Sequence, residues 1–282
     1  MRQPVLLLLI CSLASWLPAQ TPGPFPDWVS VESNISYDKY PQTVLDIFQP
    51  KTGAKGKRPG VIVIHGGGWT GRAKIKIFER MCLPYLERGF VVANIEYRLA
   101  ETAPAPAAVS DALAAAKWFR DHAAKYNVDT GRIVATGSSA GGHLSLMLGM
   151  TPGSANLGPP ARVAAVVNFC GIADVADLLE GKNQRAWAAE WVPEQQDRHR
   201  LAVRVSPITY VRKDLPPILT LHGDADEVVP YNQSVKLTEA LRASGATTEM
   251  VTVPEGGHRF ADEKLIELYP QIFEFLKRHQ IL

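Results

Sequence analysis

Hydrophobic positions along the chain form short continuous runs that alternate with longer amphipathic segments. The runs are rich in Val and Ile and do not alternate with polar residues. Continuous apolar runs are typical of strands that are covered on both faces, as in a parallel sheet. The pattern predicts such strands at residues 61–64, 90–95, 132–136, 163–169, 218–221 and 250–253.

Helical periodicity fills the segments between these runs. Helices that alternate with parallel strands cover both faces of a sheet, so we expect a fold of the α/β class with a mostly parallel, eight-stranded sheet flanked by helices. Two earlier runs, around residues 29–35 and 44–48, alternate more and predict two antiparallel strands. The expected helices lie near residues 75–88, 107–125, 140–150, 232–243 and 262–279.

Composition favours one large globular domain over residues 28–282, because 46% of the chain is hydrophobic. The 30 basic and 28 acidic residues leave a formal charge of +2. This small charge offers no strong field for a polyanion, which argues against nucleic acid as a partner. Beyond the first residues only Cys82 and Cys170 remain, too few for a disulfide framework and not spaced like a metal site. We expect both to be small buried residues.

The first 19 residues predict an export signal. Arg2 precedes an apolar run over residues 5–17, and Ala19 follows it. The run is shorter than the roughly 20 apolar residues of a membrane-spanning helix, so we expect cleavage near Ala19 and no stable membrane anchor. A proline-rich leader over residues 20–27 would then precede the domain, and the protein would be secreted or periplasmic.

A candidate nucleophile lies between a predicted strand and a predicted helix. Residues 137–141 read Gly-Ser-Ser-Ala-Gly, the G-x-S-x-G pattern of a nucleophile elbow centred on Ser139. Glycine suits the two outer positions because the strand must reverse sharply into the helix, and a side chain there would collide with neighbouring backbone. Ligands also collect at the carboxyl ends of parallel strands. By itself, however, the pentapeptide also fits a glycine-rich turn with an incidental serine.

A second predicted strand leads into His-Gly-Gly-Gly-Trp at residues 65–69. This sequence resembles the HGGG oxyanion loop of lipases and esterases. The resemblance implies that the N–H groups of Gly67, Gly68 and Ala140, the residue after Ser139, hold the oxyanion that forms when an ester carbonyl is attacked. The alternative is a phosphate-binding turn, but the loop lacks the Lys-Ser or Lys-Thr pair of a P-loop.

Two later strand ends carry acids and a histidine. His-Gly-Asp-Ala-Asp ends at Asp226, and His258 follows Glu-Gly-Gly after the last strand. Ser139, an aspartate and His258 therefore occur in the order nucleophile, acid, base, which is the order of α/β-hydrolases. By position alone Asp224 competes with Asp226, and His222 together with both aspartates is a conceivable metal cluster.

Together these motifs resemble the secreted esterases of the α/β-hydrolase superfamily, which include the BD-FAE-like (feruloyl esterase type) and hormone-sensitive-lipase-like families. The resemblance covers nearly all of the chain after the signal and implies an α/β-hydrolase fold. It rests on HGGGW (65–69), EYRLA (96–100), GSSAGGH (137–143), SPITY (206–210), HGDADEVVP (222–230) and GH (257–258).

The family pattern assigns the catalytic acid to Asp226 instead of Asp224, and it implies no metal or organic cofactor. Ser138 stands where the lipase-like branch usually has aspartate, so the chain is closer to the BD-FAE-like branch. Outside the triad, we expect Arg98 and Asp111 to hold neighbouring loops by charge-assisted hydrogen bonds.

Between residues 174 and 205 the pattern becomes irregular, at the point where this fold commonly inserts a cap over its pocket. The segment holds Trp187 and Trp191, whose four-residue spacing places them on one helix face. We expect these indoles, with Trp69 and Tyr210, to form an apolar wall for an acyl or aromatic group. Alternatively, the indoles form the core of the cap.

The sequence thus predicts a secreted serine hydrolase that cleaves carboxylic esters, with a short-chain, carbohydrate or feruloyl ester as its small-molecule or polysaccharide substrate. Ser139 would attack the carbonyl, His258 would take its proton, and Asp226 would orient His258. Two alternatives keep this triad: HGGGW also fits the HGGxW element of arylformamidases, and HGDADEVVP resembles prolyl-oligopeptidase-type peptidases. A third is a non-catalytic binding protein with a hydrolase fold.

Overall fold

The computed structural model describes residues 25–53, 55–71 and 77–282. Within them, eight strands form one sheet in the order β1-β2-β4-β3-β5-β6-β7-β8. β2 pairs antiparallel with β1 and with β4, and the neighbouring strands from β4 to β8 are all parallel. The predicted mostly parallel, eight-stranded sheet is confirmed. Its strands are β1 (Val29–Ser36), β2 (Val44–Pro50), β3 (Arg58–Ile64), β4 (Val91–Ile95), β5 (Val128–Ser138), β6 (Ala165–Phe169), β7 (Ile218–Gly223) and β8 (Thr248–Val253).

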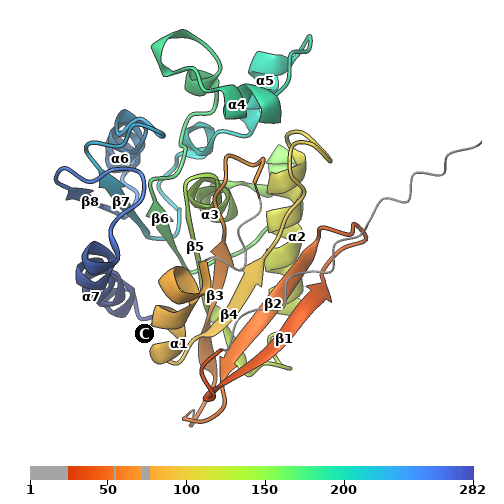
Figure 1. The fold of residues 1–282 in the computed structure, drawn as a ribbon, viewed down its shortest axis with the longest axis vertical. Coiled ribbons are helices and arrows are strands. Elements are labelled where there is room, and N and C mark those ends of the chain that lie inside the picture. Colours follow the sequence, from red (N-terminus) through yellow and green to blue (C-terminus); the bar gives the residue numbers. More distant parts are fainter. Residues whose placement is uncertain (1–24, 54, 72–76) are drawn as a thin grey trace, which may run out of the picture.

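Helices flank this sheet (Figure 1). Alternate side chains of β3 enter two separate cores. Ile62 and Ile64 belong to the core that includes residues of α2, α3 and α6, whereas Val61 and Val63 belong to the core that includes residues of α1 and α7. Because both faces are buried, the central strands contain continuous apolar runs, and the hydrophobic pattern could locate them. The helices are α1 (Leu83–Glu87), α2 (Ala107–Asp121), α3 (Ala140–Met150), α6 (Asn232–Ser244) and α7 (Asp262–Arg278).

The predicted helix boundaries are close to the observed ones, with one exception. α3 spans the predicted residues, and α6 and α7 end within one residue of the prediction, whereas α2 ends earlier, at Asp121. The exception is the helix predicted at 75–88, whose first residues lie outside the described ranges. Its described part is one π-helical turn, η2 (Phe78–Cys82), followed by α1. The two follow one another without a gap, and Pro84 lies in the first turn of α1, where the missing N–H of proline is tolerated.

The order of the strands forms a crevice at the carboxyl ends of β3 and β5. From β3 the chain forms β4 on one side and then β5 on the other. The loops that follow β3 and β5 therefore diverge, and such a switch point is where open parallel sheets bind ligands. β7 and β8 run parallel to β5, so the loops that follow them emerge at the same edge of the sheet.

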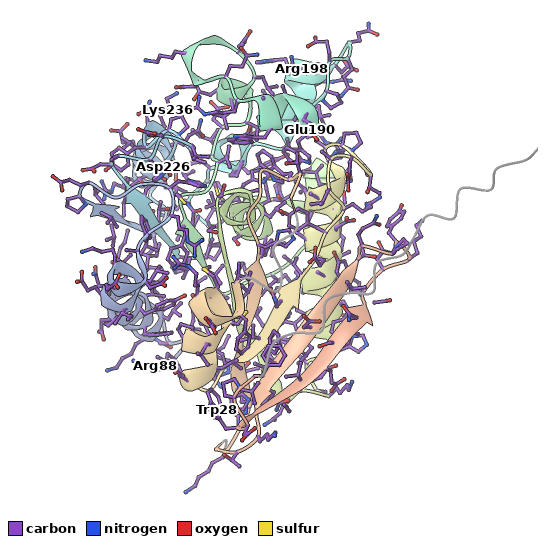
Figure 2. The ribbon with its side chains drawn as sticks, viewed as in Figure 1. Trp28, Arg88, Glu190, Arg198, Asp226 and Lys236 are labelled. Carbon is purple, nitrogen blue, oxygen red and sulfur yellow. The ribbon has the colours of Figure 1, made fainter. Side chains whose placement is uncertain are left out.

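The segment predicted as a cap, 174–205, contains short helices. Figure 1 shows α4 and α5 beyond one end of the sheet, at the top of the view, and Figure 2 marks Glu190 and Arg198 in this part of the molecule. The carbonyl of Trp191 accepts a hydrogen bond from the N–H of Ala105, which ties the segment to the loop before α2. Its helices are η4 (Ala176–Leu178), η5 (Gly181–Asn183), α4 (Ala186–Trp191) and α5 (Arg198–Arg204).

Several predictions concern residues away from the crevice. The predicted signal, 1–19, lies outside the described residues. No helix in the described part of the chain has the length and apolar character needed to cross a membrane. Cys82 and Cys170 are buried and free, as predicted. Arg98 donates to both carboxylate oxygens of Asp111, at 2.6 Å from Nη2 to Oδ1 and 2.9 Å from Nε to Oδ2. The predicted charge-assisted hydrogen bond is confirmed, and it joins the loop after β4 to α2.

Candidate active site

Ser139 occupies the sharp turn between β5 and α3. Its backbone has φ +58° and ψ −122°, a conformation that non-glycine residues rarely adopt. A Cβ atom at Gly141 would lie 2.0 Å from the carbonyl oxygen of Ile64, and one at Gly137 would lie 2.5 Å from the same oxygen. Only glycine therefore fits at the two outer positions of the pentapeptide. The turn has the geometry of a nucleophile elbow, with a strained serine at its centre.

The Ser139 side chain borders a cavity of about 520 Å³. His258, from the loop after β8, borders the same cavity, as do the glycines of the HGGGW loop after β3. The remaining wall comes mainly from η2, the end of β6, α4 and the beginning of α7. It includes Ile77, Met81, Phe169, Cys170, Trp187, Phe260 and Leu265.

His258 is paired with Asp226, the residue that Figure 2 labels beside β7 and α6. Nδ1 of His258 lies 2.8 Å from Oδ2 of Asp226. The other oxygen, Oδ1, accepts the backbone N–H groups of Val228 and Val229 at 2.8 and 2.9 Å. Burial raises the pKa of Asp226, but hydrogen bonds from His222 and His258 lower it by more, so this pKa stays well below its ordinary value. Asp226 is therefore a carboxylate at neutral pH.

The contact with Asp226 changes the pKa of His258 in the opposite direction: it lowers the pKa of the carboxyl group and raises that of the imidazole. Burial lowers the pKa of His258, but the hydrogen bonds and charges of Asp226 and Cys170 together raise it by more, so the net pKa lies above the ordinary value of about 6.5. Among the described residues, the Ser139 hydroxyl makes no hydrogen bond with His258. Catalytic hydrogen bonds of this kind are often long without substrate and tighten when it binds.

Asp224 lies outside this pair. It is exposed, and its carboxylate accepts the backbone N–H of Glu255 at 2.7 Å. The three described side chains with ligand atoms close enough to share a metal ion are Cys170, Asp226 and His258, all within 4.8 Å of one another. This trio omits Asp224, which the conceivable metal cluster required. It also includes Asp226 and His258, which are already hydrogen-bonded to each other.

A second histidine contacts the carboxylate, a role that sequence reasoning missed. Nε2 of the fully buried His222 lies 3.1 Å from Oδ2 of Asp226 and 3.2 Å from the carbonyl oxygen of Val229. Both neighbours are acceptors, so Nε2 carries the proton and donates. On the other side of the ring, Nδ1 lies 2.6 Å from the hydroxyl of Ser234. His222 and Ser234 therefore hold the carboxylate in its orientation towards His258.

The HGGGW loop presents backbone N–H groups beside Ser139. Gly67 and Gly68 have φ values of +113° and +60°, which glycine adopts without strain. The carbonyl of Gly67 accepts the N–H groups of Thr70 and Gly71, which closes the turn. In the described part of the chain, the N–H groups of Gly67 and Gly68 have no backbone acceptor. Ala140 begins α3, where the first N–H groups have no intrahelical partner.

Trp69 anchors this loop from beneath. It is fully buried and stacks on the equally buried Trp191, with ring centroids 4.0 Å apart. Its indole N–H donates to Nδ1 of His143 at 3.2 Å, and Nε2 of His143 donates to the carbonyl of Val205 at 2.7 Å. Burial lowers the pKa of His143 to about 4, so at neutral pH Nδ1 is free to accept.

Of the four aromatic residues predicted to form a wall of the pocket, only Trp187 borders the cavity. Trp187 is partly buried and borders the cavity, where it also packs on Gly68. Trp69 and Trp191 lie behind it in the core. Tyr210 is outside the cavity wall, and its hydroxyl donates to the carbonyl of Arg204. The sequence could not separate these positions, because buried and pocket-facing indoles share one helix face.

Comparison with known proteins identifies the family. The family model described as BD-FAE matches residues 45–241, which is more than half of the chain. The chain belongs to the BD-FAE family. The matched residues run from β2 into α6, so they include the HGGGW loop, the Ser139 elbow and Asp226.

Two proteins of Mycobacterium tuberculosis are similar to this chain along most of its length. It is 30% identical over 253 residues to the esterase LipQ of Mycobacterium tuberculosis, an alignment that covers 85% of this chain and 59% of LipQ. It is also 30% identical over 241 residues to the probable carboxylic ester hydrolase LipM of the same organism, with 79% and 56% covered. The chain thus spans less than two thirds of the length of these relatives.

Solved structures extend the similarity to the whole fold. A truncated carbohydrate esterase from gut microbiota is 32% identical, with a TM-score of 0.79 over 90% of this chain and 99% of that one. Native esterase 2 of Thermogutta terrifontis is 25% identical, with a TM-score of 0.74 over 91% of this chain and 94% of that one. This BD-FAE family chain therefore has the predicted α/β-hydrolase fold.

Proposed function

We propose that this protein is a serine hydrolase that cleaves carboxylic esters through an acyl-enzyme. The observation that carries the proposal is the 2.8 Å contact between Asp226 and His258, together with the single cavity that His258 and the strained Ser139 both border. The names of LipQ, LipM and the gut carbohydrate esterase support ester hydrolysis as the reaction class.

In the proposed mechanism, His258 accepts the hydroxyl proton of Ser139 as the oxygen attacks the ester carbonyl. Asp226 holds the ring of His258 with Nδ1–H towards the carboxylate, so Nε2 is left as the base. The N–H groups of Gly67, Gly68 and Ala140 donate to the oxyanion, each contributing about 10² to 10³ in rate. His258 then protonates the departing alcohol, and water, activated in the same way, releases the acid from Ser139.

The proposed substrates are short-chain, carbohydrate or feruloyl-type esters met outside the cell. A cavity of about 520 Å³ can hold a small acyl group with part of its alcohol. The predicted export signal supports secretion, and the similarity to a carbohydrate esterase supports a sugar ester. The irregular segment 174–205 is proposed as a cap, because its Trp187 forms part of the cavity wall.

A panel of substrates tests the reaction class. We expect turnover of p-nitrophenyl acetate, butyrate or octanoate, methyl ferulate or acetylated xylan, and slower turnover of an aryl formamide and a peptide p-nitroanilide. Preference for the formamide would favour the arylformamidase alternative, and preference for the anilide would favour the peptidase. A protein that turns over none of these compounds would instead fit the non-catalytic alternative.

The pH dependence follows from the raised pKa of His258. Imidazolium cannot accept the Ser139 proton, so kcat/KM for p-nitrophenyl acetate should rise as the pH rises through this pKa. Because the net shift is upwards, the midpoint should lie above 6.5. Initial rates between pH 5 and 10, corrected for spontaneous hydrolysis, measure it. A flat profile, or a midpoint below 6.5, contradicts a histidine base paired with Asp226.

Trp187 is the proposed determinant of acyl preference. Trp187→Ala should raise KM several-fold for octanoate and ferulate esters and much less for acetate, because only the larger groups reach the indole; one aromatic contact is worth about 0.5 to 1.5 kcal/mol beyond its area burial. Steady-state kinetics on the three esters measure this selectivity. An equal loss on all three would mean that Trp187 has a structural role only.

Trp191→Ala is the matched control for that experiment. This indole is fully buried against Trp69, so its loss should lower the free energy of unfolding by about 3 to 5 kcal/mol. If Trp191→Ala remains active, its KM values for the acetate, octanoate and ferulate esters should change by the same factor. Denaturant unfolding of both variants separates the two roles.

A further inference from the structure

Two guanidinium groups line the cavity that holds Ser139. Arg80 comes from η2, and Arg259 directly follows His258. Of the described residues that line this cavity, none has a carboxylate side chain, and His258 is the remaining group that can become positive. The cavity wall therefore carries positive charge directly beside the proposed catalytic base.

Arg80 is fixed in position. Its Nη2 donates to the carbonyl of Phe260 at 2.6 Å, and its Nη1 pairs with the carboxylate of Asp262. The backbone carbonyl of Arg80 also accepts the hydroxyl of Tyr269. Asp262 thus compensates the charge of Arg80, while its own carboxylate remains largely exposed.

Arg259 has no such compensation. It is exposed, and no ion pair or hydrogen bond of its side chain occurs within the described ranges. Arg80 and Arg259 border the same cavity, so their like charges repel each other there. Burial lowers the pKa of Arg80, and the charge of Arg259 lowers it further. An anion between them would relieve this repulsion, and a neutral substrate would not.

We propose that Arg259, supported by Arg80, forms a subsite for a carboxylate carried by the ester substrate. This inference rests on the proposed function and narrows it to esters with a second, anionic group, such as a uronic acid that is acylated on a hydroxyl and keeps its carboxylate free. A guanidinium is suited to this role because its planar N–H groups match the two oxygens of a carboxylate. The subsite lies next to His258, so the carboxylate would also help to place the scissile bond near Ser139.

Rigid pairs of substrates that differ only in charge provide the test. For the alcohol side of the ester, the pair is 4-acetoxybenzoate and 4-acetoxybenzamide; for the acyl side, it is monoethyl terephthalate and ethyl 4-carbamoylbenzoate. In at least one pair the wild-type protein should prefer the anion by about five- to tenfold in kcat/KM, after correction for the alkaline hydrolysis rates. The preference should weaken between 50 and 500 mM NaCl, because salt screens exposed charges.

Substitutions then locate the charge. Arg259→Gln should remove most of the anion-to-amide preference, and Arg259→Glu should invert it, whereas Arg259→Lys should keep part of it. Arg200→Gln is the control for net charge, because Arg200 is an exposed residue of α5 outside the cavity wall. It should leave the ratio unchanged.

A ratio near one in both pairs, or a ratio that Arg259→Gln does not change, overturns the subsite. In that case, hydrolysis of the ester bond in the two amide-bearing compounds, or of p-nitrophenyl acetate, would leave the proposed esterase function standing. Failure to hydrolyse any ester would defeat both proposals.

Discussion

Replacing Ser139 with alanine should lower kcat by about 10⁶-fold while the protein stays folded, because the attacking oxygen is lost and the remaining members of a triad cannot act without it. The oxyanion N–H groups of Gly67, Gly68 and Ala140 would still bind the carbonyl, so a residual acceleration of about 10³ to 10⁴ over water is expected. Alanine removes one oxygen and leaves the turn between β5 and α3 with both of its glycines.

The neighbouring serine is the matched control. Ser138 also borders the cavity, but it is the residue before the nucleophile position of the elbow, at the end of β5, and has no place in the proposed mechanism. Ser138→Ala should therefore lower kcat by less than about tenfold. Thermal unfolding of both variants checks that the fold is intact. Near-wild-type turnover in Ser139→Ala would remove this residue as the nucleophile.

Asp226→Asn should cost about 10⁴-fold in kcat, and Asp224→Asn less than tenfold. Each carboxylate oxygen of Asp226 accepts two hydrogen bonds. Oδ1 accepts the N–H groups of Val228 and Val229, and Oδ2 accepts from the rings of His222 and His258. An asparagine that keeps its oxygen towards the backbone N–H groups must turn its NH₂ group towards both rings. This favours the wrong tautomer of His258, the change that costs about 10⁴-fold in a serine protease.

Asp224 makes a different kind of contact. Its carboxylate accepts the N–H of Glu255, and an asparagine oxygen can accept the same bond. Asp226→Asn should also move the midpoint of the kcat/KM profile to lower pH, because it removes the negative charge that raises the pKa of His258. If Asp224→Asn proves the more damaging change, the acid has been assigned to the wrong residue.

The hydrophobic pattern located the central strands because β3 to β7 are largely buried on both faces, so their residues are mostly apolar and do not alternate with polar ones. The elbow could be predicted because a sharp turn against Ile64 tolerates only glycine at 137 and 141. These are local requirements, and each leaves its own trace in the sequence.

Contacts between distant segments left no such trace. His222 and Ser234 meet because α6 packs beside β7, and His143 reaches both Trp69 and Val205 across three segments of the chain. The indoles were predicted as one wall because Trp187 and Trp191 share a helix face. That spacing does not reveal that Trp191 stacks on Trp69 in the core, so that only Trp187 borders the cavity.

Mass spectrometry of the protein treated with a fluorophosphonate tests the central claim most directly. A serine that is activated by His258 and Asp226 displaces fluoride and gains one phosphonyl group, which peptide mapping can assign. We expect a single adduct on Ser139 in the native protein, a much slower reaction in Asp226→Asn, and none after denaturation. An unmodified native protein, or an adduct on another residue, would contradict the proposal that Ser139 is the nucleophile of a serine esterase.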